Sequence, residues 1–447
     1  MPRRRTRVVV AGAGLAGLAA ARYLERAGAD VTIFEARDRI GGRVLTMREG
    51  FARSQTGELG ADLIEAEQTH VLALAKALNL RTVRILRGGW GFYGGRRPQT
   101  SRNAPDTFER AAALLEPEIN AFKAAESRWD SGVAQQLGRE SVAAWLTRAR
   151  VDGQLAAAMR GLRGFYLADP EDLALLPLVD QFAEGETPGT SAMYRLRQGN
   201  DALPAAIARG LKATIHLSAP VTRVSQRQRT LTIMVGGRTR QQLSAHFLVC
   251  ALPATTLRRI VFEPALPDDQ VEAIATLRYG PATKMLLQFE SRFWKKLTGP
   301  SAYGSDRATG AVWDANEQQG RSPGILTLLA GGRASREVRD IVASAGWNGV
   351  VRRLGWLGRP SGLLSAASYT WELDPWSKGG YAVFSPRFNP TLRSWLSRPA
   401  GRIVFAGEHT SMKWQGFMNG AIESGRRAAV ELAMLAGLPY ARLTEEP

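Results

Sequence analysis

The chain has 447 residues, 45% of them hydrophobic, which is enough for more than one domain with a buried core. Its single cysteine, Cys250, excludes an internal disulfide and a thiolate metal cluster and fits a reducing compartment. The four histidines stand far apart, without the spacing of metal ligands, so we expect no metal site.

The formal net charge of +18 could attract nucleic acid, anionic lipid or acidic protein. No basic block alternates with aromatic residues as in a nucleic-acid groove, so we interpret the charge as an arginine-rich solvated surface. The basic residues Arg3 to Arg5 precede a predicted strand, not the apolar region of a signal peptide. No run of about eighteen apolar residues occurs. We therefore expect a cytoplasmic protein that binds neither nucleic acid nor membranes.

The first predicted elements are a strand at Val8–Val10, a helix at Leu15–Arg26 and a strand at Val31–Phe34. Both strands are short apolar runs containing β-branched residues. The helix shows apolar residues at helical spacing and ends before Gly28. This order predicts a βαβ unit at the start of the chain.

Three glycines follow the first strand, and each has a separate purpose. Gly12 permits the tight turn, Gly14 lets the backbone approach a pyrophosphate, and Gly17 lets the helix pack on the strand. The helix N-terminus offers free N–H groups to phosphates. Glu35 follows about twenty residues later, where a carboxylate can accept hydrogen bonds from ribose hydroxyls. The stretch thus predicts a nucleotide site, not an ordinary βαβ turn.

The residues after Glu35 distinguish between dinucleotide cofactors. A second glycine pair, Gly41-Gly42, is followed by Arg43 and lies beside the predicted phosphate site. This segment resembles the extended fingerprint of FAD enzymes related to the amine oxidases, in which the matching arginine contacts the pyrophosphate. Plain NAD dehydrogenases lack the extension. We therefore predict FAD.

Further along the chain, segments that resemble a nucleotide-binding domain alternate with segments that do not. We expect helices at His70–Leu80, within Thr107–Leu162, after the turn in Met193–Gly210, and at Gln270–Leu277 and Gly420–Leu435. We expect a hairpin at Gly88–Gly95 and strands at Val221–Val224, Leu231–Val235, His246–Ala251, Ala282–Phe289 and Arg402–Ala406. The hydrophobic pattern alone does not explain why these two kinds of segment alternate along the chain.

From the fingerprint to the C-terminal motif FAGEHTSMKWQGFMNGAIESGRRAA, the chain resembles the flavin amine oxidases: monoamine oxidases, polyamine oxidases and L-amino-acid oxidases. The resemblance implies an α/β fold whose Rossmann-like FAD-binding domain is assembled from residues 1–80, 193–264 and 383–440. Residues 81–192 and 265–382 would form an interleaved α+β substrate domain, a mixed sheet flanked by helices. Residues 441–447 would be a polar tail.

The resemblance also implies a set of cofactor contacts. The matching Gly407 and Glu408 contact the cofactor, although Glu408 could instead cap a helix or be solvated. The backbone near Phe417 would meet the flavin ring, where a helix N-terminus stabilises the reduced, anionic flavin. Val221 matches a residue whose backbone meets the adenine. The predicted set is Gly12, Gly14, Leu15, Ala16, Gly17, Glu35, Ala36, Arg37, Gly42, Arg43, Gly60, Ala61, Asp62, Val221, Gly407, Glu408, Phe417 and Met418.

Lys284 stands in the otherwise apolar predicted strand ATKMLLQF, where an ammonium group is costly without partners. In the family, the matching lysine holds a water against flavin N5. The alternative is a lysine that reaches solvent from an edge strand.

Tyr381 and Phe417 match two aromatic residues that face each other in front of the flavin in this family. Such rings hold an amine or an apolar chain and exclude water, and we expect Trp371 and Trp376 along the same wall. Gly380 matches the cysteine that carries the flavin covalently in mammalian monoamine oxidases, so we expect non-covalent FAD.

Glu65 matches a glutamate that faces the substrate amine in some polyamine oxidases, where a carboxylate binds a second ammonium group or helps remove a proton. The alternative is an exposed glutamate at the start of a helix. The arginine that grips the substrate carboxylate in venom-type L-amino-acid oxidases would fall near Leu63, and its absence counts against an amino-acid substrate. The positive charge counts mildly against long polyamines.

We predict an FAD-dependent amine oxidase, in which a hydride equivalent passes from the α-carbon of a neutral amine to flavin N5. The imine then hydrolyses, and O₂ reoxidises the flavin to give H₂O₂. The predicted catalytic residues are Lys284, Tyr381, Phe417, Glu65 and Trp376, and a homodimer is compatible with the sequence. The alternatives are an L-amino-acid oxidase, a biosynthetic oxidase of a bulky amine or amide, an FAD-dependent desaturase-type enzyme, and a nucleic-acid-binding protein with an inactive oxidase fold.

Overall fold

The computed structural model describes residues 5–95, 99–101, 104–185, 191–237, 240–296, 300–320 and 322–444. Residues 1–4 belong to the basic N-terminal stretch that we do not expect to be part of a signal peptide, and they lie outside these ranges. The last three residues of the predicted polar tail lie outside them as well. Within these ranges, every helix is too short or too polar to cross a lipid bilayer.

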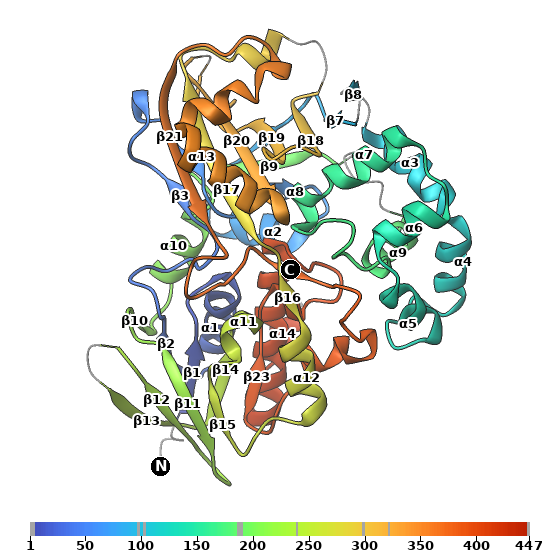
Figure 1. Cartoon of the computed structure of the whole chain (residues 1–447). Helices are drawn as coiled ribbons and strands as arrows, with labels where there is room; N and C mark the ends of the chain where they lie inside the picture. The colour runs from blue at the N-terminus through green and yellow to red at the C-terminus, as the bar shows by residue number, and fades with distance from the viewer. Residues whose placement is uncertain are drawn as a thin grey trace.

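A five-stranded parallel sheet forms one half of the molecule (Figure 1), with the order β10-β2-β1-β14-β23. Its strands are Thr214–His216, Asp30–Phe34, Arg7–Ala11, Phe247–Cys250 and Ile403–Phe405. They come from three distant parts of the sequence. Four of them are short, mostly apolar runs covered on both faces, whereas β10 is a partly exposed strand at the edge of the sheet.

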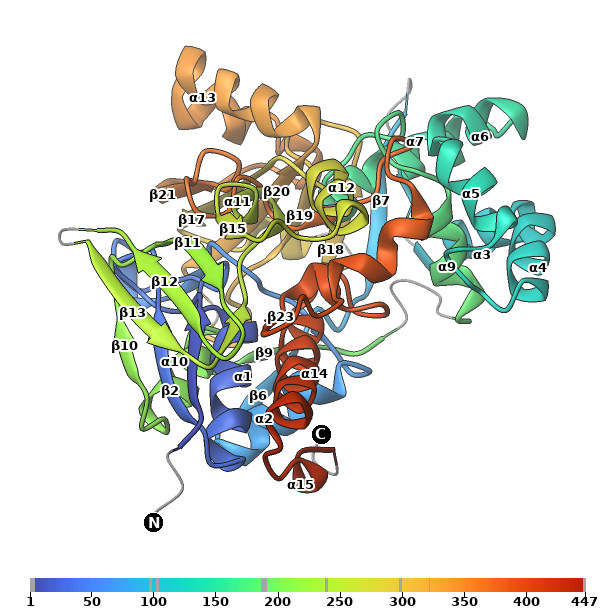
Figure 2. The same cartoon turned by 90° about the horizontal axis from the view of Figure 1, so that it is seen from below.

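Alternate side chains of β1 enter two different cores. Val8 and Val10 pack under α1 (Leu15–Arg26) and α14 (Met418–Ala436), which lie side by side in Figure 2. Val9 packs on the other face against a four-stranded sheet, β13-β12-β11-β15. The strands of that sheet are Gln241–Ala245, Leu231–Val235, Val221–Gln226 and Val261–Glu263.

A separate seven-stranded mixed sheet has the order β21-β17-β20-β19-β18-β7-β8. Its strands are Leu363–Thr370, Ala282–Phe289, Gly324–Gly331, Ala311–Asp314, Ala302–Ser305, Trp90–Gly94 and Gln99–Ser101. The helices α7 (Gly153–Gly161), α8 (Arg163–Tyr166) and α13 (Arg333–Arg352) pack on it. One parallel sheet and one mixed sheet confirm the predicted α/β class. The segment boundaries stay a prediction.

The helical patterns predicted within Thr107–Leu162 are confirmed. They correspond to α3 (Ala104–Leu114), α4 (Glu116–Ala124), α5 (Gly132–Arg139), α6 (Val142–Arg148) and α7, coloured from cyan to green on the right of Figure 1. Ser131, Ser141 and Asp152 accept backbone N–H groups at the starts of α5, α6 and α7. A further helix, α9 (Leu176–Ala183), packs against α4.

Three local predictions are wrong. Gly88–Gly95 is not a complete hairpin, because it contains only β7, whose antiparallel partner β8 lies further on. The helix α2 spans Thr69–Ala77 and does not reach Leu80, because Asn79 takes the left-handed conformation. The predicted tail forms α15 (Ala441–Thr444), in which Leu443 is buried against the nucleotide-side core.

The remaining elements connect these layers. They are β3 (Thr46–Met47), β4 (Gly57–Glu58), β5 (Ile64–Glu65), β6 (Thr82–Ile85), β9 (Met193–Leu196), α10 (Ala202–Arg209), α11 (Ala254–Leu257), α12 (Asp268–Thr276), β16 (Arg278–Tyr279) and β22 (Ala382–Val383). In the small sheet β5-β9-β6, β9 pairs with two strands that precede it in the sequence by more than 100 residues.

Candidate active site

A cavity of about 700 Å³ runs from the turn after β1 to the helices around α9. Except for Gly17, every predicted cofactor residue lines it, and so do the predicted catalytic residues Lys284, Tyr381, Phe417, Glu65 and Trp376. Gly17 lies beneath the cavity, where a Cβ would come within 1.9 Å of the Gly12 carbonyl oxygen. The fold thus gathers residues from all the predicted segments around one space.

Two helix N-termini border this cavity. The N-cap residues of α1 and α14, Gly14 and Phe417, make no capping hydrogen bond with a side chain. Each helix therefore offers N–H groups and the positive end of its dipole to the cavity. One N-terminus suits a pyrophosphate and the other suits an electron-rich ring edge, so the residues present fit FAD.

Glu35 is held where a ribose would need it. Its Oε2 accepts the Ala13 N–H and its Oε1 accepts the Arg37 N–H, both at 2.8 Å, and the side chain lines the cavity. A carboxylate has further lone pairs for hydroxyl donors. The positive φ of Gly12 permits the turn that brings Ala13 to Glu35.

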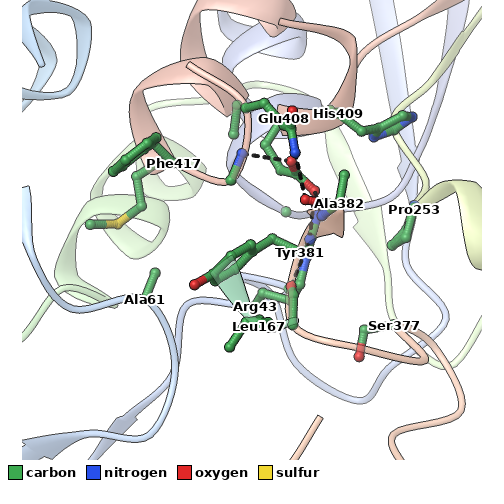
Figure 3. A pocket seen from close by; sticks show the side chains of 18 of the residues that line it. Arg43, Ala61, Leu167, Pro253, Ser377, Tyr381, Ala382, Glu408, His409 and Phe417 are labelled. Atoms are coloured by element: carbon green, nitrogen blue, oxygen red, sulfur yellow. Dashed lines mark hydrogen bonds and ion pairs between the residues drawn. The ribbon is translucent and has the colours of Figure 1, made fainter. Parts of the chain in front are cut away.

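Arg43 and Glu408 bind each other across the fold (Figure 3). Arg43 Nη1 donates to Glu408 Oε1 and to the Gly380 carbonyl, both at 2.8 Å, and Glu408 Oε2 accepts the Gly416 N–H. Burial alone would raise the pKa of Glu408, but the Arg43 charge holds it below its usual value. Glu408 is only 4% exposed, so the alternative of a solvated carboxylate is wrong.

Lys284 lies on β17, between β20 and β21, so the edge-strand alternative is wrong. Its side chain is buried, and its ammonium group donates to the Gly60 carbonyl at 2.8 Å and to Asp62 Oδ2 at 3.2 Å. The Trp313 ring lies 5.2 Å from Nζ. The lysine has the partners that burial demands, and it still lines the cavity.

The side chain of Asp62 is the centre of this buried network. It also accepts Arg195 Nε at 2.6 Å and Trp313 Nε1 at 2.9 Å. Burial would raise its pKa, but Arg195 and Lys284 together lower it. The sequence analysis missed Arg195, although an arginine in the apolar stretch MYRL carries the same signal as Lys284. With its carboxylate engaged in this way, the predicted contact of Asp62 with the cofactor stays a prediction.

Tyr381 and Phe417 border the same space in Figure 3, from the turn before β22 and from the start of α14. Tyr381 Oη donates to the Phe165 carbonyl, and burial raises the pKa of the phenol, so it stays protonated. Phe417 is 38% exposed and packs edge-on to Trp414. Trp371 also lines the cavity and donates to the Leu59 carbonyl at 3.0 Å.

Glu65 belongs to β5, where it pairs with Met193 of β9. The alternative of a glutamate at the start of a helix is therefore wrong. Glu65 is partly exposed and lines the cavity, as does the neighbouring Leu63. Its contact with a substrate stays a prediction.

The far part of the cavity was missed by the sequence analysis. Its walls carry aromatic side chains from β7, α3, α8, β19, the loop before α5, the segment after β22 and the loop before α14, namely Trp90, Phe92, Phe108, Trp129, Phe165, Tyr166, Trp313, Phe384 and Trp414. Such residues usually belong to a core, so their pattern carries no signal for a site. Asp180 of α9 was missed as well.

The family model for flavin containing amine oxidoreductases matches residues 15–433. The chain belongs to this family. The predicted family is thus confirmed, and this flavin-containing amine oxidoreductase is an enzyme that acts on CH–NH donors.

Relatives of this amine oxidoreductase differ in substrate. The L-amino-acid oxidase of Mus musculus is 28% identical over 95% of this chain and 70% of its own. Cyclohexylamine oxidase from Brevibacterium oxydans has a TM-score of 0.82 at 24% identity, over 97% of this chain and 100% of its own. Putrescine oxidase bound to putrescine has a TM-score of 0.81 at 21% identity, over 97% and 100%. These structures share the fold.

Proposed function

We propose that this protein is an FAD-dependent oxidase of amines, with non-covalent FAD and O₂ as the electron acceptor. The observation that carries the proposal is the single cavity, which joins two uncapped helix N-termini to an aromatic chamber. When bound, FAD supplies a two-electron acceptor, so that an amine and O₂ give an imine and H₂O₂. Water then converts the imine to a carbonyl compound and ammonia or a smaller amine.

The side chains of this protein act mainly on the protonation state of the substrate. A free alkylamine has a pKa of about 10.4, so it enters as an ammonium ion. Aromatic walls that include Tyr381 and Phe417 exclude water and favour the neutral form, whose lone pair assists loss of the α-hydride. Burial lowers the pKa of His409 to about 4, so this cavity residue is neutral and does not repel a cation.

The charges of the cavity favour an amine over an amino acid. Its basic residues Arg37, Arg43, Lys284 and Lys413 are paired with Asp374, Glu408, Asp62 and Glu184. The fifth, Arg259, is exposed, follows α11 and donates to the Pro375 carbonyl. Four of the five basic side chains of the described cavity wall are thus already paired with carboxylates, and the leucine at position 63 agrees with a substrate that carries no carboxylate.

The chemistry of the cysteine supports non-covalent binding. Position 380 is a glycine, and Cys250, the only cysteine in the sequence, is 2% exposed on β14. Burial raises the pKa of its thiol to about 12, so the nucleophilic thiolate is suppressed. Acid precipitation should therefore release the flavin into the supernatant.

The function is tested by the visible spectrum of the purified protein, titrated anaerobically with alkylamines, diamines and L-amino acids. We expect the flavin absorbance to bleach with amines and to return, with formation of H₂O₂, when O₂ is admitted. Bleaching with L-amino acids alone would favour the L-amino-acid oxidase alternative. A protein that cannot be loaded with FAD would refute the proposal.

Lys284→Met is expected to slow reoxidation by O₂ by about 10²-fold, the usual effect of removing one preorganised donor. Two hydrogens of the ammonium group are used by Gly60 and Asp62, and the third remains to hold a water at the cavity wall. Stopped-flow mixing of the amine-reduced protein with O₂ measures the rate. The exposed Lys123→Met serves as the control, and reoxidation of Lys284→Met at the parent rate would refute the assignment.

A further inference from the structure

Asp180 places a carboxylate in the far wall of the cavity, on α9. Its Oδ2 accepts a hydrogen bond of 3.0 Å from Trp129 Nε1. No lysine, arginine or histidine nitrogen of the described residues lies within ion-pair distance of it. The carboxylate is therefore fixed in direction but not neutralised.

The charged groups around Asp180 do not neutralise its carboxylate. Arg393 is the basic group that acts on it, but its guanidinium lies over the rings of Trp129 and Phe384 at 5.5 and 4.7 Å, and it donates to the carbonyls of His409 and Ser411. Glu184, the C-cap residue of α9, adds negative charge, although Lys413 pairs with it. Tyr166, the titratable group facing Asp180 from α8, is neutral because burial raises its pKa.

Ionised Asp180 is unfavourable in the protein alone. Burial raises the pKa of Asp180 to about 6, so the carboxylate is ionised at neutral pH against an unfavourable environment. A partly buried carboxylate without a cationic partner on a cavity wall lowers stability, and a carboxyl group with a shifted pKa in a cavity is a candidate ligand site.

The surroundings of Asp180 suit a cation. The rings of Phe108, Trp129, Tyr166 and Phe384 line the same cavity, and ring faces attract ammonium groups. Tyr166 donates to Gln181, the neighbour of Asp180, and Tyr381 donates to Phe165, the neighbour of Tyr166. The aromatic path from Tyr381 to Asp180 therefore passes along adjacent residues.

We propose that Asp180 binds a second ammonium group of the substrate, and that the preferred substrates are diamines and other amines with a distal cation. The inference rests on the proposed function, because it assumes that one end of the substrate is oxidised near Tyr381. It assigns the distal cation to Asp180 rather than to Glu65.

Asp180→Asn is the test, since the amide oxygen still accepts from Trp129 while the charge is lost. Two substrate series are compared, α,ω-diamines and n-alkylamines with the same numbers of carbons. We expect KM for the preferred diamine to rise about 10- to 100-fold, as for loss of a charge-assisted hydrogen bond. KM for n-alkylamines should stay near the parent value. Asp130→Asn, an exposed carboxylate next to Trp129, is the matched control.

The pH dependence supplies a second readout. In the parent protein, KM for a diamine should fall as the pH rises through about 6, because Asp180 ionises there while the amine stays protonated. Asp180→Asn should lack this change. Because the folded state holds this proton more tightly than the unfolded state, the ionisation penalty on the fold develops from about pH 4 and is complete above about pH 6. Asp180→Asn should therefore melt above the parent at pH 8, with the gain absent at pH 4.

Binding measured without turnover separates the two proposals. Diamine is added to the FAD-loaded protein after its flavin has been reduced chemically under exclusion of O₂, so that no electrons can pass from the amine, and the change in melting temperature is recorded. A change that Asp180→Asn abolishes supports Asp180 even where no amine is oxidised and the proposed function fails. Equal KM effects on both amine series, or a diamine response that survives in Asp180→Asn, would overturn the inference.

Discussion

Asp62→Ala is expected to lower the free energy of unfolding by about 3–5 kcal/mol, the usual effect of removing one partner from a buried ion pair. Asp62 accepts hydrogen bonds from Arg195, Lys284 and Trp313, and all four side chains are buried. Without the carboxylate, two cations face each other in a low-dielectric interior. Chemical denaturation at neutral pH measures the loss.

The matched control for this change is Asp172→Ala, whose partner is Arg278 and whose side chains are more than half exposed. Its effect should stay below about 1 kcal/mol, because solvent screens an exposed pair. The pKa of Asp62 is lowered in the fold, so its contribution is complete above the unfolded value of about 4 and is lost as the pH falls further. A loss in Asp62→Ala no larger than in Asp172→Ala would contradict the network.

Gly17→Ala is expected to prevent stable FAD binding and to destabilise the fold by about 3 kcal/mol or more, as overpacking does where backbone cannot move away. The added Cβ would lie 1.9 Å from the Gly12 carbonyl oxygen and 3.2 Å from Val10 Cγ1. Relief of this contact requires α1 to move off β1, which displaces the helix N-terminus from the cavity. The ratio of flavin to protein absorbance and the melting temperature measure both effects.

Gly153→Ala, at the start of α7, is the control, since nothing lies within 4 Å of the added Cβ. It should retain the parent flavin content and melt at or slightly above the parent temperature. If Gly17→Ala behaves in the same way, the close contact between α1 and the turn is not required.

The charged residues of the cavity show which features can be predicted from the local sequence and which cannot. Lys284 was singled out because an ammonium group in an apolar strand demands partners, and the structure supplies Gly60 and Asp62. Which partners it would find depended on strands far apart in the chain. Arg43 and Glu408 were each assigned to the cofactor from their motifs, whereas their mutual ion pair appears only when the two ends of the chain meet.

The sequence by itself determined the nucleotide cradle and the family. Those features depend on local rules, since a glycine turn, a helix start and an acidic strand end act within one βαβ unit. Only the tertiary structure decided the aromatic part of the cavity, the Asp62–Arg195–Lys284 network and the position of Asp180, which has no cationic partner among the described residues. Aromatic residues on helices show the same sequence spacing whether they lie in a core or at a cavity. Whether a carboxylate forms an ion pair depends on residues far away in the sequence, so the sequence alone does not reveal it. The aromatic wall of the cavity could therefore not be predicted from the sequence taken in order.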